Sequence, residues 1–317
     1  MNPARLARCL AELAGALLLV LLSACATPQV SRLQSDAGDL PATGSVSGVP
    51  FFAQKEYECG PAAQAMVLSA AGVAVTPDEL VQQVYLPARK GSLQVEMLAA
   101  TRQRGLLAYR LQPNLKDLLA EVAAGHPVLV FQNVSLPIYP VWHYAVVIGY
   151  DLKRNTITLH SGETASMEMS LFAFERTWER GNYWSMLALP AGLLPATADL
   201  PSLARSAADL EAQQPQVALA TYNAALARWP GDANLLLGQG NSEYALGQIP
   251  VAIQAYRAAV QARPDFADAW NNLAQAQLDA GNRVAAAQAI AEAVKLGGAR
   301  LAQYQALQTQ IQSATPQ

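Results

Sequence analysis

The chain contains little cysteine, little histidine and no excess of positive charge. Lysine and arginine together number 21, against 24 aspartate and glutamate residues, so the formal net charge is −3 at pH 7. Proteins that bind nucleic acid through its phosphates need a basic surface, and this balance argues against a nucleic-acid partner. Only one run is long and apolar enough to enter a membrane, and it lies within the first 25 residues, which argues against a polytopic transporter.

The N-terminal segment has the pattern of an export signal. Arg5 and Arg8 precede an apolar stretch that ends in Leu-Ser-Ala-Cys at Cys25. This ending resembles the signal of a bacterial lipoprotein, which implies that residues 1–24 are a signal peptide and that the thiol of Cys25 carries a lipid. Ala26, in place of Asp, implies the outer membrane and a position facing the periplasm. An ordinary secretory signal and a single membrane-anchoring helix are the alternatives.

Removal of the signal peptide is expected to leave one free thiol in the mature chain. Cys9 leaves with the signal peptide and a lipidated Cys25 is blocked, so Cys59 is the only free thiol of the mature chain. No disulfide can form within that chain, although the expected compartment is oxidising. A lone thiol there is either a buried, inert side chain or one kept for chemistry.

The composition changes along the chain in a way that indicates two folded units. The length of 317 residues and a hydrophobic content of 52% suffice for a core in each. Residues 25–47 begin with the lipidated cysteine and are rich in Ser, Thr, Pro, Gly and Asp without periodicity, which predicts a flexible linker. Residues 48–192 show helical patterns first and strand patterns later. This order predicts an α+β domain in which helices pack on a largely antiparallel sheet.

The individual elements of this domain are predicted from periodicity and from turn and capping residues. Helices are expected at 59–71, from the capping box Thr76–Glu79 onward, at 94–104 and at 115–123. Strands are expected at 49–52, 127–132, 143–150, 156–160 and 183–189.

Residues 198–315 repeat with a period of 34, which predicts stacked helical hairpins. The equivalent positions carry Pro230 and Pro264, Gly247 and Gly281, Tyr222 and Tyr256, and Ala225, Ala259 and Ala293. This resembles a tetratricopeptide-repeat array with two full repeats, a degenerate leading repeat and a C-terminal cap helix near 300–311. An Ala-rich coiled coil is the alternative, but a heptad pattern does not give a step of 34. Such arrays bind a peptide or protein in their concave groove.

The residues around Cys59 favour a nucleophile over a structural cysteine. Cys59, Gly60 and Pro61 open an apolar helical pattern, so the thiol stands at a helix start, where unpaired N–H groups and the helix dipole stabilise a thiolate. Gly60 is expected to let the backbone approach a substrate. The alternative is a buried apolar cysteine, which fits poorly beside Gly-Pro and the neighbouring Gln and Glu residues.

A thiolate nucleophile in acyl transfer needs an imidazole with which to exchange protons and a donor for the oxyanion. His143 opens an apolar strand pattern and is the predicted base, with an ordinary strand-edge histidine as the alternative. His126 lies in Gly-His-Pro between a helix and a strand and is predicted to be a solvated turn residue. A metal site formed by His126, His143 and His160 is disfavoured, because no closely spaced pair of metal ligands accompanies these histidines. No cofactor is predicted.

Three motifs within residues 49–190 together resemble the bacteriocin-processing, double-glycine-leader peptidase superfamily, whose members have papain-like folds. They are the Gln…Cys-Gly-Pro-Ala-Ala helix start, a Pro-Val-Leu-Val strand and the strand His-Tyr-Ala-Val-Val-Ile-Gly-Tyr at 143–150. The resemblance implies that Cys59 is the nucleophile, that His143 is the general base and acid, and that Gln54 is the oxyanion-hole donor. Gln54 stands five residues before Cys59, one closer than in the family pattern.

In that family a third catalytic residue, an Asp or Asn that orients the imidazole, lies at the end of the strand that follows the His strand. This sequence has no carboxylate at that position. His160 takes that place and is predicted to accept a hydrogen bond from the His143 ring. Asp151, just past the His143 strand, is the alternative orienting residue or else a turn residue. A neutral imidazole stabilises an imidazolium less than a carboxylate does, which predicts reduced activity or an unusual proton path.

These features predict a lipid-anchored cysteine peptidase of the bacterial envelope, in which Cys59 attacks a peptide carbonyl and His143 protonates the leaving amine. The expected partners are a peptide or protein substrate, a protein bound by the repeats and the membrane that holds the lipid. The repeats would raise the local concentration of what they bind. Two alternatives remain open: a cell-wall amidase or transpeptidase that uses the same thiol, and a catalytically idle scaffold lipoprotein that acts through its repeats.

Overall fold

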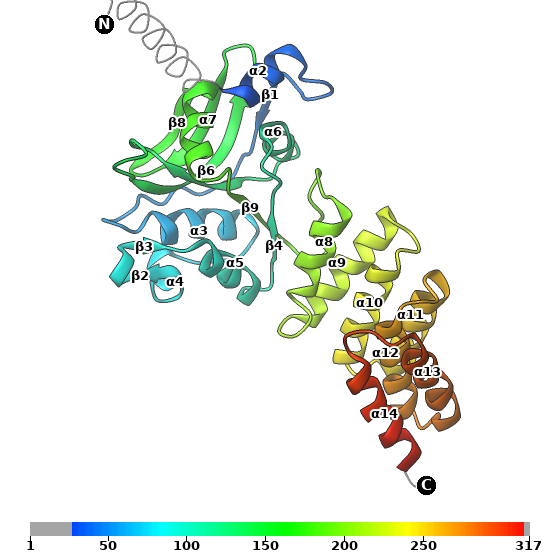
Figure 1. The fold of residues 1–317 in the computed structure, drawn as a ribbon. Coiled ribbons are helices and arrows are strands. Elements are labelled where there is room, and N and C mark those ends of the chain that lie inside the picture. The colour runs from blue at the N-terminus through cyan, green and yellow to red at the C-terminus, as the bar shows by residue number, and fades with distance from the viewer. Residues whose placement is uncertain (1–26, 314–317) are drawn as a thin grey trace, which may run out of the picture.

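The computed structural model describes residues 27–313, which form a mixed domain of helices and strands followed by an arm of helices (Figure 1). The predicted signal peptide at 1–24, the predicted lipidation site Cys25 and residues 314 and 315 of the predicted repeat region lie outside the described residues. Within residues 27–313, no helix is long and apolar enough to cross a bilayer.

A seven-stranded antiparallel sheet forms the centre of the N-terminal domain. Its strands lie in the order β4-β9-β5-β6-β7-β8, and the short β1 pairs with the C-terminal end of β6. Their bounds are β1 Thr43–Ser45, β4 Leu107–Arg110, β5 Val128–Asn133, β6 Trp142–Asp151, β7 Thr156–Ser161, β8 Thr164–Ser170 and β9 Ser185–Leu189. A hairpin of β2 (Tyr85–Leu86) and β3 (Gly91–Ser92) lies apart from this sheet.

Helices cover both faces of the sheet, because its strands direct apolar side chains alternately to two sides. In β6, Ala145 and Val147 enter one core, while Tyr144 and Val146 enter the other. The first core is closed by α2 (Pro28–Ser35), α6 (Leu115–Ala123) and α7 (Leu171–Arg180), and the second by α3 (Cys59–Ala70), α4 (Pro77–Val84) and α5 (Gln94–Gln103). The predicted α+β fold with a largely antiparallel sheet is confirmed.

The prediction of a flexible linker over residues 25–47 is wrong for the part that the structure describes. Helix α2 buries Val30 and Leu33, which lie three residues apart and therefore on one side of the helix. The buried carboxylate of Glu175 accepts hydrogen bonds from the backbone N–H groups of Gln29 (2.9 Å) and Val30 (2.7 Å). Two apolar side chains and a partner 145 positions away order a segment whose composition is typical of a linker.

The arm consists of three helical hairpins and a final helix. The helices are α8 (Leu200–Ala208), α9 (Pro215–Arg228), α10 (Ala233–Ala245), α11 (Ile249–Ala262), α12 (Ala267–Asp279), α13 (Arg283–Leu296) and α14 (Leu301–Ser313). Tyr222 and Tyr256, equivalent in the 34-residue period, pack against Gly238 and Gly240 of α10. A Cβ atom on these glycines would lie 2.1 Å and 2.5 Å from the rings, so glycine permits the close packing of the helices. The predicted tetratricopeptide-type array is confirmed.

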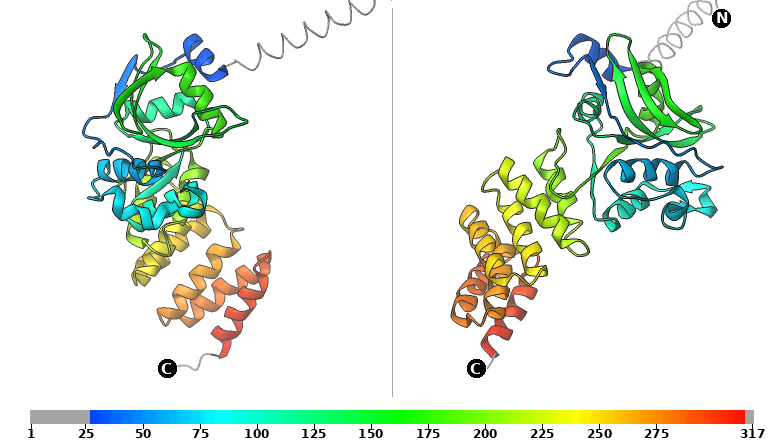
Figure 2. Two further views of the ribbon diagram at one scale, coloured as in Figure 1. Left: turned by 90° about the vertical axis from the view of Figure 1, so that its left-hand side faces the viewer. Right: turned by 180° about the vertical axis from the view of Figure 1, so that it is seen from behind.

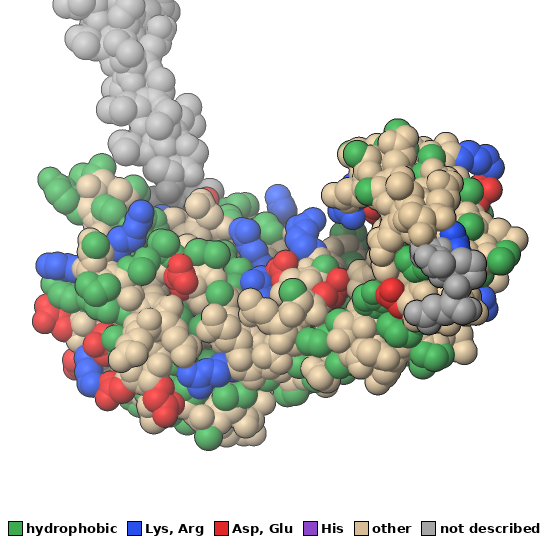
Figure 3. All heavy atoms as spheres, turned by 90° about the horizontal axis from the view of Figure 1, so that it is seen from below, with side chains coloured by type: hydrophobic (Ala, Val, Ile, Leu, Met, Phe, Trp, Pro, Cys, Tyr) green, Lys and Arg blue, Asp and Glu red, His purple; other side chains and the backbone are tan. Residues whose placement is uncertain are grey.

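The first hairpin of the arm packs directly onto the N-terminal domain. Leu203 and Ala207 of α8 are buried in the same core as Leu107 and Tyr109 of β4. Two further views show that the later hairpins curve away from this contact (Figure 2). Figure 3 shows the hollow that this curvature leaves between the N-terminal domain and the end of the arm. The two parts therefore share one core at the junction and separate beyond it.

Candidate active site

Cys59, His143 and Gln54 line one cavity of about 980 Å³ in the N-terminal domain. Gln54 lies in the segment before α3, Cys59 is the first residue of α3, and His143 is the second residue of β6. The β2–β3 hairpin also borders the cavity, and it lies on the side of the domain away from the helical arm (Figure 1). The structure thus brings together the three residues that the motifs selected.

The first turn of α3 positions the sulfur of Cys59. Pro61 in this turn and the apolar run after it favour helix formation from residue 59 onward. Gly60 has a role other than the expected approach to a substrate, since a Cβ atom there would lie 2.1 Å from Oγ of Ser92 in β3. Glycine therefore lets the β2–β3 hairpin pack against the start of α3 beside the thiol.

Burial raises the pKa of the Cys59 thiol. Hydrogen bonding from the backbone N–H groups of Tyr144, Gly60 and Cys59 lowers the same pKa, but by less than burial raises it. The N–H groups expected at the helix start are present, yet desolvation outweighs them. The resting side chain at neutral pH is therefore a thiol, and its proton has to be removed before the sulfur can attack.

His143 lies two residues beyond the last pair of the β6–β7 ladder, Ala145 with Ser161. Its Nε2 lies 2.9 Å from Oγ of Ser161, within hydrogen-bond distance. Burial lowers the pKa of His143, which favours the neutral ring near pH 7. No hydrogen bond joins His143 to Cys59 in the described part of the chain. Because Ser161 engages Nε2, Nδ1 is the nitrogen left to accept the thiol proton.

The structure places Ser161, and not the predicted His160, beside His143. Successive residues of a strand point to opposite faces of a sheet. Ser161 pairs with Ala145 and His160 pairs with Val146, so Ser161 shares a face with residues 143 and 145 while His160 faces the other way. The missed residue is the immediate neighbour of the predicted one, and the two-residue period of the strand is the signal that identifies it.

His160 instead holds the segment that leads to α3. Its Nε2 lies 3.2 Å from the carbonyl oxygen of Val49, and its Nδ1 accepts a hydrogen bond from the backbone N–H of Ser166 at 3.2 Å. Its ring also meets the ring of Phe51 edge to face, with centroids 5.3 Å apart. Because Nδ1 accepts, Nε2 carries the proton and donates to Val49. His160 is therefore a buried structural residue.

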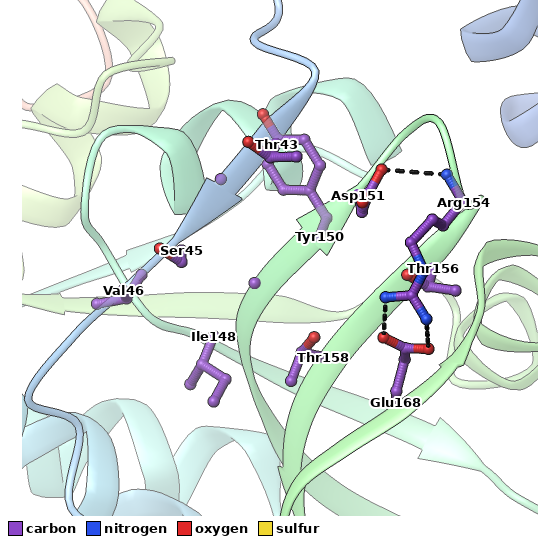
Figure 4. A pocket seen from close by; sticks show the side chains of 12 residues that line it. Thr43, Ser45, Val46, Ile148, Tyr150, Asp151, Arg154, Thr156, Thr158 and Glu168 are labelled. Atoms are coloured by element: carbon purple, nitrogen blue, oxygen red, sulfur yellow. Dashed lines mark hydrogen bonds and ion pairs between the residues drawn. The ribbon is translucent and has the colours of Figure 1, made fainter.

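Asp151, the alternative orienting residue, lies at the opposite end of β6 from His143. Eight residues of extended strand separate the two, a distance of about 26 Å. The Asp151 carboxylate accepts hydrogen bonds from the backbone N–H groups of Lys153 (2.9 Å) and Arg154 (3.1 Å). Figure 4 shows this turn beside a separate cavity of about 380 Å³, where Arg154 pairs with Glu168 through two hydrogen bonds. Asp151 is thus a turn residue.

The side chain of Gln54 lines the cavity, and its Oε1 is buried without a hydrogen-bond partner. Its backbone N–H donates to the carbonyl oxygen of Gly162 at 3.1 Å, which fixes the segment before α3 against the β7–β8 turn. This oxygen can accept a hydrogen bond from an incoming donor, and the Nε2–H₂ group of the same amide can donate one. The spacing of five residues therefore still brings Gln54 to the cavity that contains Cys59.

The other walls of the cavity combine aromatic and basic side chains. Phe131 stacks on Trp142 with ring centroids 5.1 Å apart and contacts the ring of Tyr144 at 4.8 Å. At another wall, Nζ of Lys90 lies 5.0 Å from the ring centroid of Tyr57. Tyr57 and Lys90 both have positive φ angles, of 63° and 48°, which is a strained conformation for residues other than glycine. The cavity therefore offers both an apolar and a charged surface.

The third histidine, His126, lies outside this cavity. Its Nδ1 is 2.7 Å from the carboxylate of Glu121, which also accepts hydrogen bonds from Ala196 and Thr197 where the chain enters the arm. Only 12% of the His126 side chain is exposed, so the prediction of a solvated turn residue is wrong. Over residues 27–313, no group of three or more His, Cys, Asp or Glu side chains is arranged to hold a metal ion.

A third cavity, of about 340 Å³, lies in the arm between α10 and α12. Its lining is aromatic and amide in character: Asn241, Tyr244, Tyr256, Asn271, Asn272 and Gln275. Oδ1 of Asn241 accepts hydrogen bonds from Asn272 (2.9 Å) and Tyr256 (3.1 Å). Amide groups both donate and accept hydrogen bonds, as a peptide backbone does. The groove is therefore suited to the backbone of an extended polypeptide.

Both parts of the chain match known families. Residues 46–186 match the Peptidase_C39 like family, and residues 240–281 match the TPR repeat. No curated protein matches the chain. A putative C39-like peptidase from Bacillus anthracis has a similar structure, with 17% identity, a TM-score of 0.39 and coverage of 47% of this chain and 98% of that one.

Two further solved structures are similar to one part of the chain each. A double glycine motif protease from an AMS/PCAT transporter, in complex with the leader peptide, is 21% identical with a TM-score of 0.36, over 46% of this chain and 98% of that one. The type III secretion translocator chaperone SycD of Yersinia enterocolitica is 18% identical with a TM-score of 0.34, over 36% of this chain and 83% of that one. The family matches place a region that resembles the Peptidase_C39 like family before an arm with a match to the TPR repeat.

Proposed function

We propose that the chain is a lipid-anchored cysteine peptidase of the bacterial envelope, with Cys59 as nucleophile and His143 as general base and acid. The shared cavity carries the proposal. The only free thiol of the expected mature chain and an imidazole held by Ser161 line the same space of about 980 Å³ within a Peptidase_C39 like domain. A thiol nucleophile and an imidazole base are the components that acyl transfer by a cysteine enzyme requires.

The reaction starts from a neutral thiol and a neutral imidazole, since burial raises the pKa of Cys59 and lowers that of His143. Nδ1 of His143 accepts the thiol proton as the sulfur attacks the peptide carbonyl. This step requires the tautomer with the proton on Nε2, which donates to Oγ of Ser161 at 2.9 Å and leaves Nδ1 free. The imidazolium then gives its proton to the leaving amine as the C–N bond breaks, and a thioester remains on Cys59.

Water completes the cycle. His143 takes a proton from a water molecule that attacks the thioester, which releases the carboxylic acid product and restores the Cys59 thiol. The N–H groups at the start of α3 and the side-chain Nε2–H₂ group of Gln54 would donate to the oxyanion that forms in both steps. Ser161 is a neutral acceptor and stabilises the imidazolium less than a carboxylate would, so we expect slower turnover than a carboxylate-assisted pair achieves.

The arm and the anchor determine where this chemistry acts. The amide-lined groove between α10 and α12 would recruit a protein substrate or partner and raise its local concentration. The Leu-Ser-Ala-Cys ending at Cys25 supports lipidation, and Ala26 supports an outer-membrane position facing the periplasm. The ordered α2, which starts three residues after Cys25, supports a position of the domain close to the membrane surface.

The test incubates the purified mature protein with a mixture of synthetic peptides and identifies the products by mass spectrometry. We expect cleavage of a subset of peptides, and a loss of rate of at least about 10³-fold in Cys59→Ala and in His143→Ala. His126→Gln is the matched control, because His126 lies outside the cavity, and it should retain the wild-type rate. Cleavage that persists in Cys59→Ala would overturn the proposal.

A catalytically idle scaffold is the second candidate, and two observations favour it. Ser161 stands where a carboxylate would assist His143, and burial raises the pKa of the Cys59 thiol. A scaffold would cleave no peptide, would tolerate Cys59→Ala in cells and would lose its function when residues 249–313, whose removal leaves the shared core intact, are deleted. Products released only from purified cell wall would assign the same thiol chemistry to a cell-wall amidase.

A further inference from the structure

The loop between β5 and β6 exposes a run of apolar side chains to solvent. Of the thirteen exposed large hydrophobic side chains within residues 27–313, six lie in this loop or at the first residue of β6: Val134, Leu136, Ile138, Tyr139, Val141 and Trp142. We call these six side chains the apolar rim. Ile138 is 76% exposed and Tyr139 is 74% exposed, and residues 133–142 include no charged residue. Contiguous exposed apolar side chains of this kind mark contact surfaces.

Polar contacts hold this loop in one shape with the apolar rim outward. Oδ1 of Asn133 accepts hydrogen bonds from the backbone N–H groups of Ser135 and Val141, both at 3.0 Å. Arg180, the last residue of α7, donates to the carbonyl oxygen of Ser135 at 2.7 Å. The apolar rim is therefore a preformed surface, and binding to it does not first require the loop to become ordered.

Helix α7 connects the apolar rim to the start of the described chain. Its Glu175 binds two N–H groups in the first turn of α2, and its Arg180 binds the rim loop. These positions are five residues apart, about 7.5 Å along the helix. Figure 1 shows α2 and α7 together at one end of the domain. Thr27 follows Cys25 by two residues, which span at most about 7 Å. A lipid on Cys25 would therefore be held near the apolar rim.

We propose that the apolar rim inserts into the surface of the membrane to which Cys25 is anchored. The location rests on the proposed lipidation, whereas the chemistry of the rim does not. Aromatic and aliphatic side chains in a run of residues that contains no charged side chain suit the boundary between lipid head groups and acyl chains. Val141 and Trp142 belong both to the rim and to the lining of the catalytic cavity. Insertion opens this cavity at the membrane surface, so the substrate is a polypeptide segment held there.

The test uses the full mature chain with Cys25→Ser, which lacks the lipid and isolates the affinity of the rim. Cosedimentation with vesicles of phosphatidylethanolamine and phosphatidylglycerol measures its partition. We expect binding that falls about tenfold or more in Leu136→Ser/Ile138→Ser, because two apolar side chains no longer enter the lipid. Neither residue lines the catalytic cavity. Val251→Ser/Val284→Ser, which changes two exposed valines of the arm, is the matched control and should bind unchanged.

Equal partition of the two double variants, or no binding by the Cys25→Ser chain, would overturn the membrane proposal. The membrane proposal also fails if Leu136→Ser/Ile138→Ser keeps its vesicle binding but loses peptide cleavage in the absence of vesicles. The apolar rim would then bind the substrate and not the membrane. An unchanged alkylation rate at Cys59 shows that the variant is folded. The mass of the wild-type N-terminal peptide tests lipidation separately, so a failure of the anchor and a failure of the rim are distinguishable.

Discussion

The hydrogen bond between His143 and Ser161 pairs the proposed base with a hydroxyl group in a buried position. A hydroxyl can orient the imidazole, but it stabilises a positive charge on the ring less than a carboxylate does. Burial acts in the same direction, because it lowers the pKa of His143 and raises that of Cys59. Both side chains therefore favour their neutral forms, and in the proposed mechanism the charged pair would exist mainly while a substrate is being attacked.

Substitution of Ser161 is expected to change His143 directly. Ser161→Ala removes a hydrogen bond worth about 1 kcal/mol, so kcat should fall about fivefold to tenfold. Ser161→Asp places a carboxylate beside the ring and should raise the pKa of His143, followed by NMR titration of its ring protons. His160→Ala is the comparison. It removes the contact with Val49 and should lower thermal stability while the titration of His143 stays in place. A changed pKa of His143 in His160→Ala, together with an unchanged pKa in Ser161→Asp, would contradict the assignment of Ser161 as the residue that orients His143.

Alkylation of Cys59 should follow a raised thiol pKa. Iodoacetamide reacts with the thiolate, and a raised pKa leaves less thiolate at every pH below it. Because burial raises the pKa of Cys59, the rate should increase with pH and reach half of its maximum above about 8.5, the value of an unperturbed thiol. Intact-mass counting of adducts between about pH 5 and 10, in the mature Cys25→Ser chain, measures it. A rate already at its plateau below pH 7 would indicate a preformed thiolate–imidazolium pair instead.

Elements with a strong local signal could be predicted from the sequence, whereas elements held by distant partners could not. Helix α4 starts as expected, with the Thr76 N–H donating to Glu79 at 3.0 Å. Helix α2 depends on Glu175, which no local pattern reveals, and β8 is exposed at most positions, so it shows little alternation. The residues of the candidate site differ in the same way. Cys59 carries a local motif, but Ser161 is identified only when the strand register is known.

Removal of the Glu175 carboxylate should release α2 from the domain. Glu175→Ala leaves one buried and one partly buried N–H group without an acceptor, and hydrogen bonds to charged groups contribute about 1.5–3 kcal/mol each. Hydrogen exchange of residues 28–35, measured by mass spectrometry, should become at least about tenfold faster. Glu179→Ala, on an exposed position of the same helix, is the control and should leave this exchange rate unchanged. Equal protection in both variants would show that α2 is held mainly by its apolar side chains.

At the scale of the whole molecule, the N-terminal domain and the first hairpin of the arm form one cooperative body. Leu203 of α8 and Leu107 of β4 are fully buried in a single core. The carboxylate of Glu121 adds hydrogen bonds to Ala196 and Thr197 at the junction. A core shared in this way couples the unfolding of the two parts, so the arm is a rigid extension of the domain near the junction.

A cavity made at the junction should therefore destabilise both parts together. Leu203→Ala removes a fully buried side chain and should cost about 2–5 kcal/mol. Calorimetry should show the main transition moving to lower temperature, together with faster alkylation of Cys59 near that temperature. Leu296→Ala, at a partly exposed position at the far end of α13, is the control and should shift the transition little. Two separate transitions, of which Leu203→Ala moves only the arm, would argue against one cooperative body.

The β2–β3 hairpin marks the mouth of the catalytic cavity on the side of the domain that faces away from the arm, whereas the amide-lined groove lies between α10 and α12 (Figure 1). A short peptide can therefore occupy one of these places and leave the other vacant, so short ligands of the two should not compete. Only a long chain, or two molecules at once, can fill both. For the proposed peptidase, selection would then depend on the length of the polypeptide as well as on the residues beside the cleaved bond.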